Sequence, residues 1–342
     1  MIRTRALRKT FRTREKGLFG PRAVKTAVDG LDLEIPAGRV TGLLGLNGAG
    51  KTSTIKILAT LLRPTSGTVT LDGLDLVDHA REARRRINLI AGGERMVYGK
   101  LTGAENLRYF GHLYDVPGAV LRPRIGELLE LVGLTGAADT PVERYSRGMT
   151  QRLSIARGLI NDPAYLLLDE PTLGLDAPIA RDLRRVVAGL AAEGRGVLLT
   201  SHYLAEVEEL CEHVYVISGG RHLAAGSPAE LKTQTGSHRS VRVTVTNPSP
   251  ELESAVADFA LRLGVRAELG VTGQGGLLVT VRHPEDVAGP LAGAIVAAGG
   301  AIGGLEVTEA SLEDAVLALT GTASAPTGTT AAPADSRTAV SA

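Results

Sequence analysis

The first two thirds of the chain alternate between strand-like and helix-like hydrophobic patterns. Residues 28–44 alternate apolar and polar positions and then become a buried apolar run, which is typical of strands leading into a glycine-rich turn. A helical periodicity follows over residues 51–62, and most of residues 81–159 is helical in pattern. Strand and helix signals alternate again over residues 165–201. This order predicts an α/β fold in which helices cover a mostly parallel sheet.

Two glycine-containing segments predict short antiparallel hairpins. Residues 66–76 turn at Gly73, and residues 213–223 turn at a Gly-Gly pair. A short helix that begins at Pro228 follows the second hairpin, because proline is favoured in the first turn of a helix. We expect this helix to end a first unit that spans residues 1–235.

The hydrophobic pattern changes beyond this first unit. Alternating valines over residues 241–245 and an apolar run over residues 277–281 predict two strands. Residues 252–263 predict an amphipathic helix, and an alanine-rich helix follows later in the chain. A closing helix over residues 311–319 is expected to complete a small C-terminal α+β accessory domain, residues 236–320.

Two segments near the C-terminus have an unusual composition. Residues 321–342 contain 19 Gly, Ala, Ser, Thr or Pro among 22, so we expect a disordered tail without chemistry. The uncharged run over residues 287–305 has 19 positions, but six are Gly and six are Ala. Such a run predicts a short amphipathic helix and not a membrane span. If the protein works at a membrane, we expect another chain to supply the membrane part.

Composition and charge narrow the classes of function. With 342 residues, 44% hydrophobic and 22% charged, the chain has room for about two folded domains. A net charge of +1 gives no general reason to expect a nucleic-acid partner, although residues 1–26 carry nine Lys or Arg against one acid. For that segment we favour a solvated surface with some role near anionic lipid or phosphate. The single cysteine, Cys211, excludes an intramolecular disulfide and predicts a small buried apolar side chain.

The first candidate for chemistry is the glycine-rich segment GLNGAGKT, residues 45–52. It matches G-x-x-x-x-G-K-[ST] and lies between an apolar strand and a helix, as this motif requires. Backbone N–H groups of such a loop point at phosphates, Lys51 is expected to reach the β- and γ-phosphates, and the Thr52 hydroxyl to bind magnesium. The predicted nucleotide-binding residues of this loop are Asn47, Gly48, Ala49, Gly50, Lys51, Thr52 and Ser53.

A second candidate is a pair of carboxylates at the end of the apolar strand 165–169. Burying Asp169 and Glu170 there is costly unless a metal or a proton compensates. Asp169 fits as the magnesium partner of Thr52, and Glu170 as the base that orients an attacking water. A strand ending in Asp-Glu can also be a helix cap or a surface turn. The phosphate-binding loop makes the functional interpretation the preferred one.

Three further segments complete a family pattern. Residues 145–152 (YSRGMTQR), 173–176 (LGLD) and 200–202 (TSH) follow the two motifs above. In order and spacing, the set resembles the nucleotide-binding subunit of ABC transporters over about residues 1–235. The resemblance implies a P-loop fold of the ABC type, in which an antiparallel β subdomain and a helical subdomain at about residues 85–160 flank the parallel sheet.

A closer resemblance is to the ATPases of daunorubicin-resistance-type (ABC-2 type) drug exporters. It is carried by the GLNGAGKTS loop, the YSRGM segment and the C-terminal sequence SLEDAVLALTG, residues 311–321. It implies ATP and Mg²⁺ as cofactors and a separate integral-membrane ABC-2 type permease as partner. The chain is then expected at the cytoplasmic face of the cell membrane.

The segment YSRGMTQR is also interpretable physically. Ser146 is expected to cap a helix whose positive end can face an anion. In the family this anion is the γ-phosphate held by the opposite subunit, so the resemblance implies a homodimer that sandwiches two ATP molecules. It further assigns Gly148 and Asp176 to nucleotide binding and His202 to sensing the γ-phosphate. The predicted catalytic residues are Lys51, Glu170 and His202.

The aromatic residue that stacks on adenine lies in the first strand of the family. Phe11, in LRKTF, is the best match, although a basic insertion over residues 12–25 separates it from the next strand. The alternative for Phe11 is plain core packing.

Two positions depart from the family pattern. The usual Q-loop glutamine, a magnesium ligand that couples to the membrane subunit, should fall near residues 92–94, yet no Gln occurs between Thr52 and Thr150. Glu94 or a water molecule could take its place. Arg147 replaces the first glycine of the usual signature pair and adds a cation close to the expected triphosphate.

These features favour the ATP-hydrolysing subunit of an exporter for a hydrophobic drug, antibiotic or lipid-like molecule. An alternative is a soluble ABC-type ATPase that acts on ribosomes or DNA. Ribosomal members usually carry two cassettes and DNA-repair members carry long coiled coils, and neither occurs here. A nucleotide sensor that scarcely hydrolyses ATP is disfavoured by Glu170 and His202.

Overall fold

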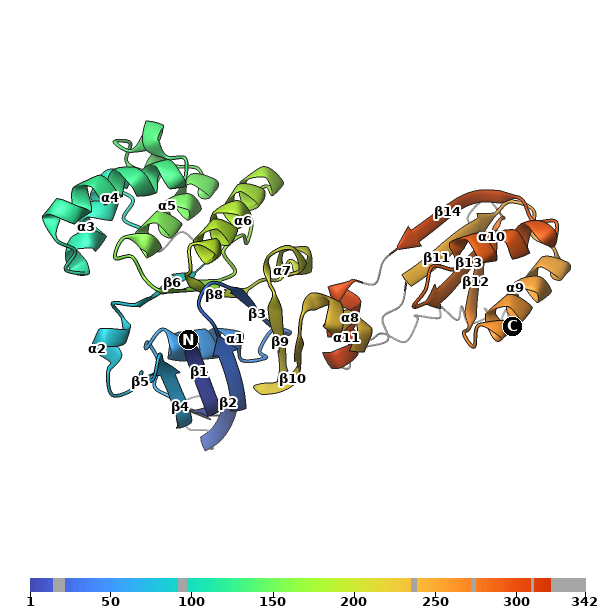
Figure 1. Ribbon diagram of the computed structural model, residues 1–342, viewed down its shortest axis with the longest axis horizontal. Coiled ribbons are helices and arrows are strands. Elements are labelled where there is room, and N and C mark those ends of the chain that lie inside the picture. The colour runs from blue at the N-terminus through green and yellow to red at the C-terminus, as the bar shows by residue number, and fades with distance from the viewer. Residues whose placement is uncertain (15–21, 92–96, 235–238, 272–274, 309–310, 321–342) are drawn as a thin grey trace, which may run out of the picture.

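Three β-sheets and the helices around them make up the described part of the chain (Figure 1). The computed structural model describes residues 1–14, 22–91, 97–234, 239–271, 275–308 and 311–320. The predicted tail, residues 321–342, and the position of the expected Q-loop glutamine, residues 92–94, lie outside the described residues.

The central sheet has six strands, and all but one of its neighbouring pairs are parallel. In spatial order they are β10 (Arg221–Gly226), β9 (His213–Ser218), β3 (Val40–Leu44), β8 (Gly196–Thr200), β7 (Tyr165–Asp169) and β6 (Ile87–Ala91). Every residue of β3 and β8 is buried, as expected of parallel strands covered on both faces. The predicted α/β class with a mostly parallel sheet is confirmed.

A four-stranded antiparallel sheet packs beside the central one. Its strands are β2 (Arg22–Ile35), β1 (Ile2–Arg14), β4 (Ser66–Leu71) and β5 (Leu74–Asp75). The short helices α1 (Lys51–Leu58) and α2 (Ala80–Ala83) contribute side chains to the same apolar cluster. Much of the predicted basic insertion, residues 12–14 and 22–25, continues the β1–β2 hairpin.

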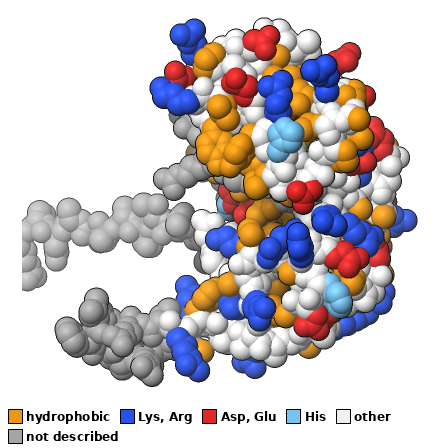
Figure 2. Space-filling model, turned by 90° about the vertical axis from the view of Figure 1, so that its left-hand side faces the viewer, with side chains coloured by type: hydrophobic (Ala, Val, Ile, Leu, Met, Phe, Trp, Pro, Cys, Tyr) orange, Lys and Arg blue, Asp and Glu red, His pale blue; other side chains and the backbone are white. Residues whose placement is uncertain are grey.

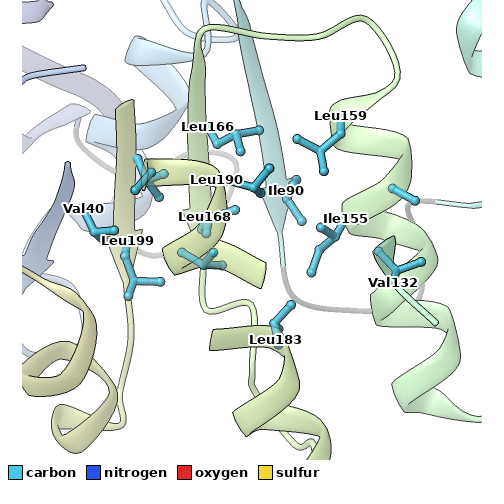
Figure 3. Close-up of a cluster of buried hydrophobic side chains, with 14 of the residues drawn as sticks. Val40, Ile90, Val132, Ile155, Leu159, Leu166, Leu168, Leu183, Leu190 and Leu199 are labelled. Carbon is cyan, nitrogen blue, oxygen red and sulfur yellow. The ribbon is translucent and has the colours of Figure 1, made fainter. Parts of the chain in front are cut away.

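Helices gather at the other side of the central sheet. They are α3 (Gly103–Leu113), α4 (Gly118–Leu131), α5 (Arg147–Leu159), α6 (Ala177–Ala192) and α7 (Leu204–Leu210), with short 3-10 turns at Thr135–Ala137 and Val142–Arg144. Ile155 and Leu159 of α5 belong to one buried cluster with Ile90 of β6 and with Leu166 and Leu168 of β7 (Figure 3). This cluster fixes α5 on the edge of the sheet.

The third sheet forms a small C-terminal domain with its own apolar core. Its elements follow as β11 (Arg239–Val245), α9 (Pro250–Arg262), β12 (Ala267–Val271), β13 (Leu277–His283), α10 (Ala288–Ala297) and β14 (Ile302–Thr308). The order βαββαβ with spatial arrangement β12-β13-β11-β14 is of the ferredoxin-like type. Across the described part of the chain, every helix is too short or too polar to cross a membrane.

The last helix lies elsewhere than the sequence pattern predicts. Helix α11 (Leu312–Thr320) packs with α7 and with α8 (Pro228–Gln234), and its buried side chains join the cluster under the central sheet. We expected this closing helix to complete the small C-terminal domain. Its apolar spacing fits any apolar face, so the sequence pattern alone could not distinguish the two partners.

Candidate nucleotide-binding site

The glycine-rich loop connects β3 to α1 and passes through a tight space. A Cβ atom at Gly45 would lie 2.2 Å from the carbonyl oxygen of Ile217, and one at Gly50 would lie 2.4 Å from that of Ala27. Gly50 also has φ +112°, a left-handed value that favours glycine. No side chain caps the helix that begins at Lys51, so its first N–H groups can face an anion.

Lys51 is buried at the base of this loop, with 7% of its surface exposed. Its ammonium donates to the carbonyl oxygens of Gly45 at 2.6 Å and Leu46 at 3.3 Å. Burial lowers the pKa of Lys51, and the charges of Glu170 and Asp169 oppose this effect. The loop lysine and the two predicted carboxylates therefore share one electrostatic environment.

A pocket of about 460 Å³ opens at the loop. The residues that line it are Phe11, Arg12, Lys25, Ala27, Asn47, Gly48, Ala49, Gly50, Lys51, Thr52, Ser53 and Glu170. Phe11 is 36% exposed, and the Lys9 ammonium lies 5.2 Å from the centre of its ring. The structure thus places Phe11 beside the phosphate-binding loop, and it adds Arg12 and Lys25, two cations that the sequence analysis had not assigned to the site.

The two carboxylates lie at the end of β7, with Asp169 as its last residue, and are oriented by the neighbouring strand β8. Asp169 accepts a hydrogen bond of 2.7 Å from the Thr200 hydroxyl, and the Glu170 amide donates to the Thr200 carbonyl at 3.0 Å. Glu170 has φ +53°, a strained conformation for a residue with a side chain. Its Oε1 atom lies 2.7 Å from Nε2 of His202. The structure brings the predicted base and the predicted γ-phosphate sensor into direct contact.

The oxygen donors near the loop fit a magnesium ion that is held jointly with phosphates. Thr52 presents a hydroxyl at an exposed position, and Asp169 presents a carboxylate. Magnesium keeps several water ligands and takes only one or two protein oxygens when it binds substrate phosphates. Among the described residues no group of three or more His, Cys, Asp or Glu could hold a metal ion alone.

The predicted signature residues lie apart from this pocket. Ser146 is the N-cap of α5, where its side chain accepts a 3.3 Å hydrogen bond from the Met149 amide. A Cβ atom at Gly148 would lie 2.5 Å from the Ile179 side chain, and Asp176 is the N-cap residue of α6. Neither Ser146, Gly148 nor Asp176 lines the loop pocket. Within one chain, the residues assigned to nucleotide binding therefore form two separate groups.

Arg147 contacts a neighbouring loop of its own chain. Its guanidinium donates a 3.1 Å hydrogen bond to the carbonyl oxygen of Leu173. A Cβ atom at Gly174 would lie 2.4 Å from the same guanidinium. Arg147 thus joins the segment expected to face the triphosphate to the LGLD segment, a contact that a glycine could not make.

Glu206 is a site residue that the sequence analysis missed. It is 2% exposed, and its Oε2 accepts hydrogen bonds from the Ser201 hydroxyl at 2.5 Å and the Thr172 hydroxyl at 2.9 Å. Ser201 precedes His202 and Thr172 follows Glu170 by two positions, so this carboxyl joins the segments that carry these two predicted catalytic residues. No sequence motif marks Glu206, because its role depends on the folded contact. The predicted burial of Cys211 is confirmed, and burial raises the pKa of its thiol.

Glu206 gives a prediction for the pH dependence of stability. Burial raises the pKa of Glu206 above its usual 4.5, and the two hydroxyl hydrogen bonds only partly oppose this effect. The neutral side chain therefore contributes stability that is fully present below the usual glutamate pKa and is lost as pH rises through the raised value. In Glu206→Gln that pH-dependent loss should disappear.

The measurement is the melting temperature of parent and Glu206→Gln over the range from about pH 4 to about pH 8. As pH rises, the melting temperature of the parent should fall relative to that of Glu206→Gln. Glu127→Gln, an exposed position on α4, is the matched control. A difference that stays constant with pH would contradict the raised pKa.

Known proteins share this arrangement over most of the chain. A family profile described as ABC transporter matches residues 28–173. The Nod factor export ATP-binding protein I of Ralstonia nicotianae is 37% identical over 299 residues, which cover 87% of this chain and 90% of that protein. The daunorubicin/doxorubicin resistance ATP-binding protein DrrA of Streptomyces peucetius is 43% identical, over 72% of each chain.

A solved structure agrees with the sequence relatives. It is described as the ATP-binding subunit of an ABC transporter and superposes with a TM-score of 0.59 at 27% identity, over 69% of this chain and 93% of that chain. The matched family region contains the phosphate-binding loop, Asp169 and Glu170. The protein is an ATPase, and it belongs to the ATP-binding subunits of the ABC transporter family.

Proposed function

We propose that this ATPase drives a separate integral-membrane permease of the ABC-2 type, at the cytoplasmic face of the membrane, and that the complex exports a hydrophobic drug, antibiotic or lipid-like molecule. The observation that carries the proposal is the pocket in which Lys51 and Glu170 meet, with His202 in contact with Glu170. The drug-resistance and export names of the relatives, at 37–43% identity, support export as the direction.

In this proposal each pocket residue has a definite role toward ATP. The loop amides and the Lys51 ammonium bind the phosphates, and the Phe11 ring stacks on the adenine. Thr52 and Asp169 hold Mg²⁺, which when bound neutralises charge on the phosphate oxygens. Glu170 accepts a hydrogen bond from the attacking water, and His202 holds the Glu170 carboxylate at 2.7 Å.

The separation of the two residue groups supports a site shared between two copies of the chain. The positive end of α5 at Ser146 has no phosphate-binding loop beside it in its own chain. In a head-to-tail homodimer Ser146, Gly148 and Asp176 of each copy complete the pocket of the other, so two ATP molecules lie in the interface. ATP binding then closes the dimer, and hydrolysis with release opens it.

This assignment predicts different defects at Lys51 and Glu170. Glu170→Gln should keep ATP binding within about threefold and lower the hydrolysis rate by at least roughly a hundredfold, because only the water-orienting base is lost. It should elute as a dimer with ATP and as a monomer with ADP in size-exclusion chromatography. Lys51→Ala should weaken binding and hydrolysis together.

The control is Glu253→Gln at an exposed position of α9, which should match the parent in every assay. A Glu170→Gln protein that hydrolyses ATP at the parental rate would contradict the assigned base. Equal elution in ATP and ADP, at a protein concentration where the parent is tested in parallel, would contradict the shared site.

An exposed aromatic cluster is the surface that best fits a permease. Tyr98 and Tyr109 are 49% and 43% exposed, and their ring centroids lie 5.0 Å apart. Phe110 stacks on Tyr98 at 5.9 Å, and Leu113 is 64% exposed one turn further along α3. Figure 2 shows hydrophobic side chains gathered in the upper part of the face where α3 lies. Exposed aromatic groups of this kind mark protein interfaces.

The aromatic cluster is held in place before any partner binds. The buried Asn106 side chain accepts from the Tyr98 amide at 2.7 Å and donates to the Tyr98 carbonyl at 3.0 Å. The Arg157 guanidinium lies 5.0 Å from the centre of the Phe110 ring and donates to the Leu89 carbonyl of β6 at 3.1 Å. Arg157 belongs to α5, so a partner on the cluster would contact the helix that begins at Ser146.

A charged substitution at this surface should separate transport from hydrolysis. Tyr109→Arg should leave the ATPase rate of the purified chain within about twofold, since Tyr109 lies outside the nucleotide pocket. It should reduce membrane association and drug resistance in cells that co-express the membrane protein encoded by the neighbouring gene. Desolvating an arginine against an apolar partner weakens the interface.

Leu131→Arg on α4 is the matched control, because Leu131 is also 43% exposed but lies outside the aromatic cluster. It should behave as the parent in cells. Full resistance with Tyr109→Arg would place the permease elsewhere. A neighbouring gene product without roughly six hydrophobic spans, or a lack of resistance on co-expression with the unmodified chain, would contradict export itself.

A further inference from the structure

Helix α11 is built into the ATPase cassette, residues 1–234, although it follows the small domain in the chain. Leu312, Ala315 and Val316 are buried in the same apolar cluster as Val207 of α7 and Leu231 of α8. The helix contacts α7, α8, β9 and β10, and in Figure 1 it lies beside α8. The chain therefore leaves the cassette at α8, forms the small domain, and returns to the cassette at α11.

The first turn of α11 is tied directly to α7. The Leu312 amide donates a 2.7 Å hydrogen bond to the Glu208 carboxylate, whose other oxygen accepts from Lys232 of α8 at 3.2 Å. Ser311 and Asp314 close the turn, because the Asp314 amide donates to the Ser311 hydroxyl at 3.1 Å. A carboxylate that accepts from a backbone amide at a helix start is a strong, oriented contact.

Helix α7 is the direct continuation of the segment that carries His202. Only Tyr203 separates His202 from the first residue of α7. Glu206 on α7 binds the Ser201 hydroxyl at 2.5 Å, so a shift of this helix would move the residue next to His202. Such a shift would alter the 2.7 Å contact between His202 and Glu170.

Helix α11 also lines a pocket beside the phosphate-binding loop and His202. A pocket of about 210 Å³ lies between Gly45 of the phosphate-binding loop, His202, and the α11 residues Glu313, Val316 and Leu317. The same helix therefore approaches His202 in two ways, through α7 and across this pocket.

We propose that α11 is a positioning element of the ATPase site, which holds the segment from Ser201 to α7 so that His202 stays against Glu170. The cassette then reaches its full hydrolysis rate only when the chain after the small domain is seated on α7 and α8. This inference rests on the catalytic role proposed for His202, and it adds a requirement that lies outside the matched family region.

The test places a charge under α11 in the full-length chain. Ala315 is fully buried, so Ala315→Arg should displace the helix, whereas Ala257→Arg puts the same side chain at an exposed position of α9. For Ala315→Arg we expect a roughly tenfold lower kcat and a Kd for a non-hydrolysable ATP analogue within about twofold of the parent. Ala257→Arg should match the parent in both.

A double variant distinguishes positioning from a general loss of packing. If α11 acts through His202, Ala315→Arg combined with His202→Ala should be no slower in single-turnover hydrolysis than His202→Ala alone. Glu208→Ala removes the acceptor of the Leu312 amide without placing charge in the core, and we expect it to lower kcat about threefold. This second variant keeps the test available if Ala315→Arg does not yield soluble protein.

Three results would overturn the inference. They are a parental kcat in both Ala315→Arg and Glu208→Ala, rate losses that multiply in the double variant, and an analogue Kd that rises as much as kcat falls. A His202→Ala protein with the parental rate would instead remove the catalytic role of His202. That result is distinguishable from a failure of the α11 inference, because the His202→Ala variant leaves α11 unchanged.

Discussion

The rest of the site depends on the buried ammonium of Lys51, which lies near two carboxylates and donates to backbone carbonyls. Lys51 is almost fully covered, so its charge is tolerable only because loop carbonyls accept hydrogen bonds from its ammonium and because Asp169 and Glu170 lie near. Parallel strands meet this requirement, since their carboxyl ends share one edge of the sheet. The loop after β3 and the carboxylates at the end of β7 are thereby brought together across β8.

The strand between them, β8, orients both carboxylate residues. Its last residue, Thr200, contacts both carboxylate positions, and the chain then runs directly into Ser201 and His202. Glu206 links the two segments, because its carboxylate accepts hydrogen bonds from the Ser201 hydroxyl and from the Thr172 hydroxyl. Burial raises the pKa of this carboxyl, and its hydrogen bonds join the residue next to His202 to the loop that follows Glu170.

Local motifs explain why so much of the nucleotide pocket could be predicted from the sequence. The phosphate-binding loop contains its own strand, turn and helix start, so Lys51 and Thr52 need no distant information to be placed. The α/β order of the first unit follows equally from short-range periodicity. Glu206, Arg12 and Lys25 could not be found in this way, because only the folded chain shows what they face.

In the small domain, the sequence pattern also failed to predict some of the secondary structure. Strands β12 and β14 were missed, since AELGV and IGGLEVT contain glycines and expose most of their side chains. Helix α11 was recognised as a helix but assigned to the wrong neighbours, because an apolar stripe specifies burial and not the surface that provides it.

The way in which the small domain is inserted leaves the core of the cassette continuous. Its first and last strands pair side by side, with Ser240 opposite Thr308, and the helices that precede and follow it, α8 and α11, also pack together. Both exits of the domain thus lie next to each other, and both anchors on the cassette do as well. The small domain is therefore an insertion between two helices that pack on each other, and the cassette core runs without interruption from Leu231 on α8 to Leu312 on α11.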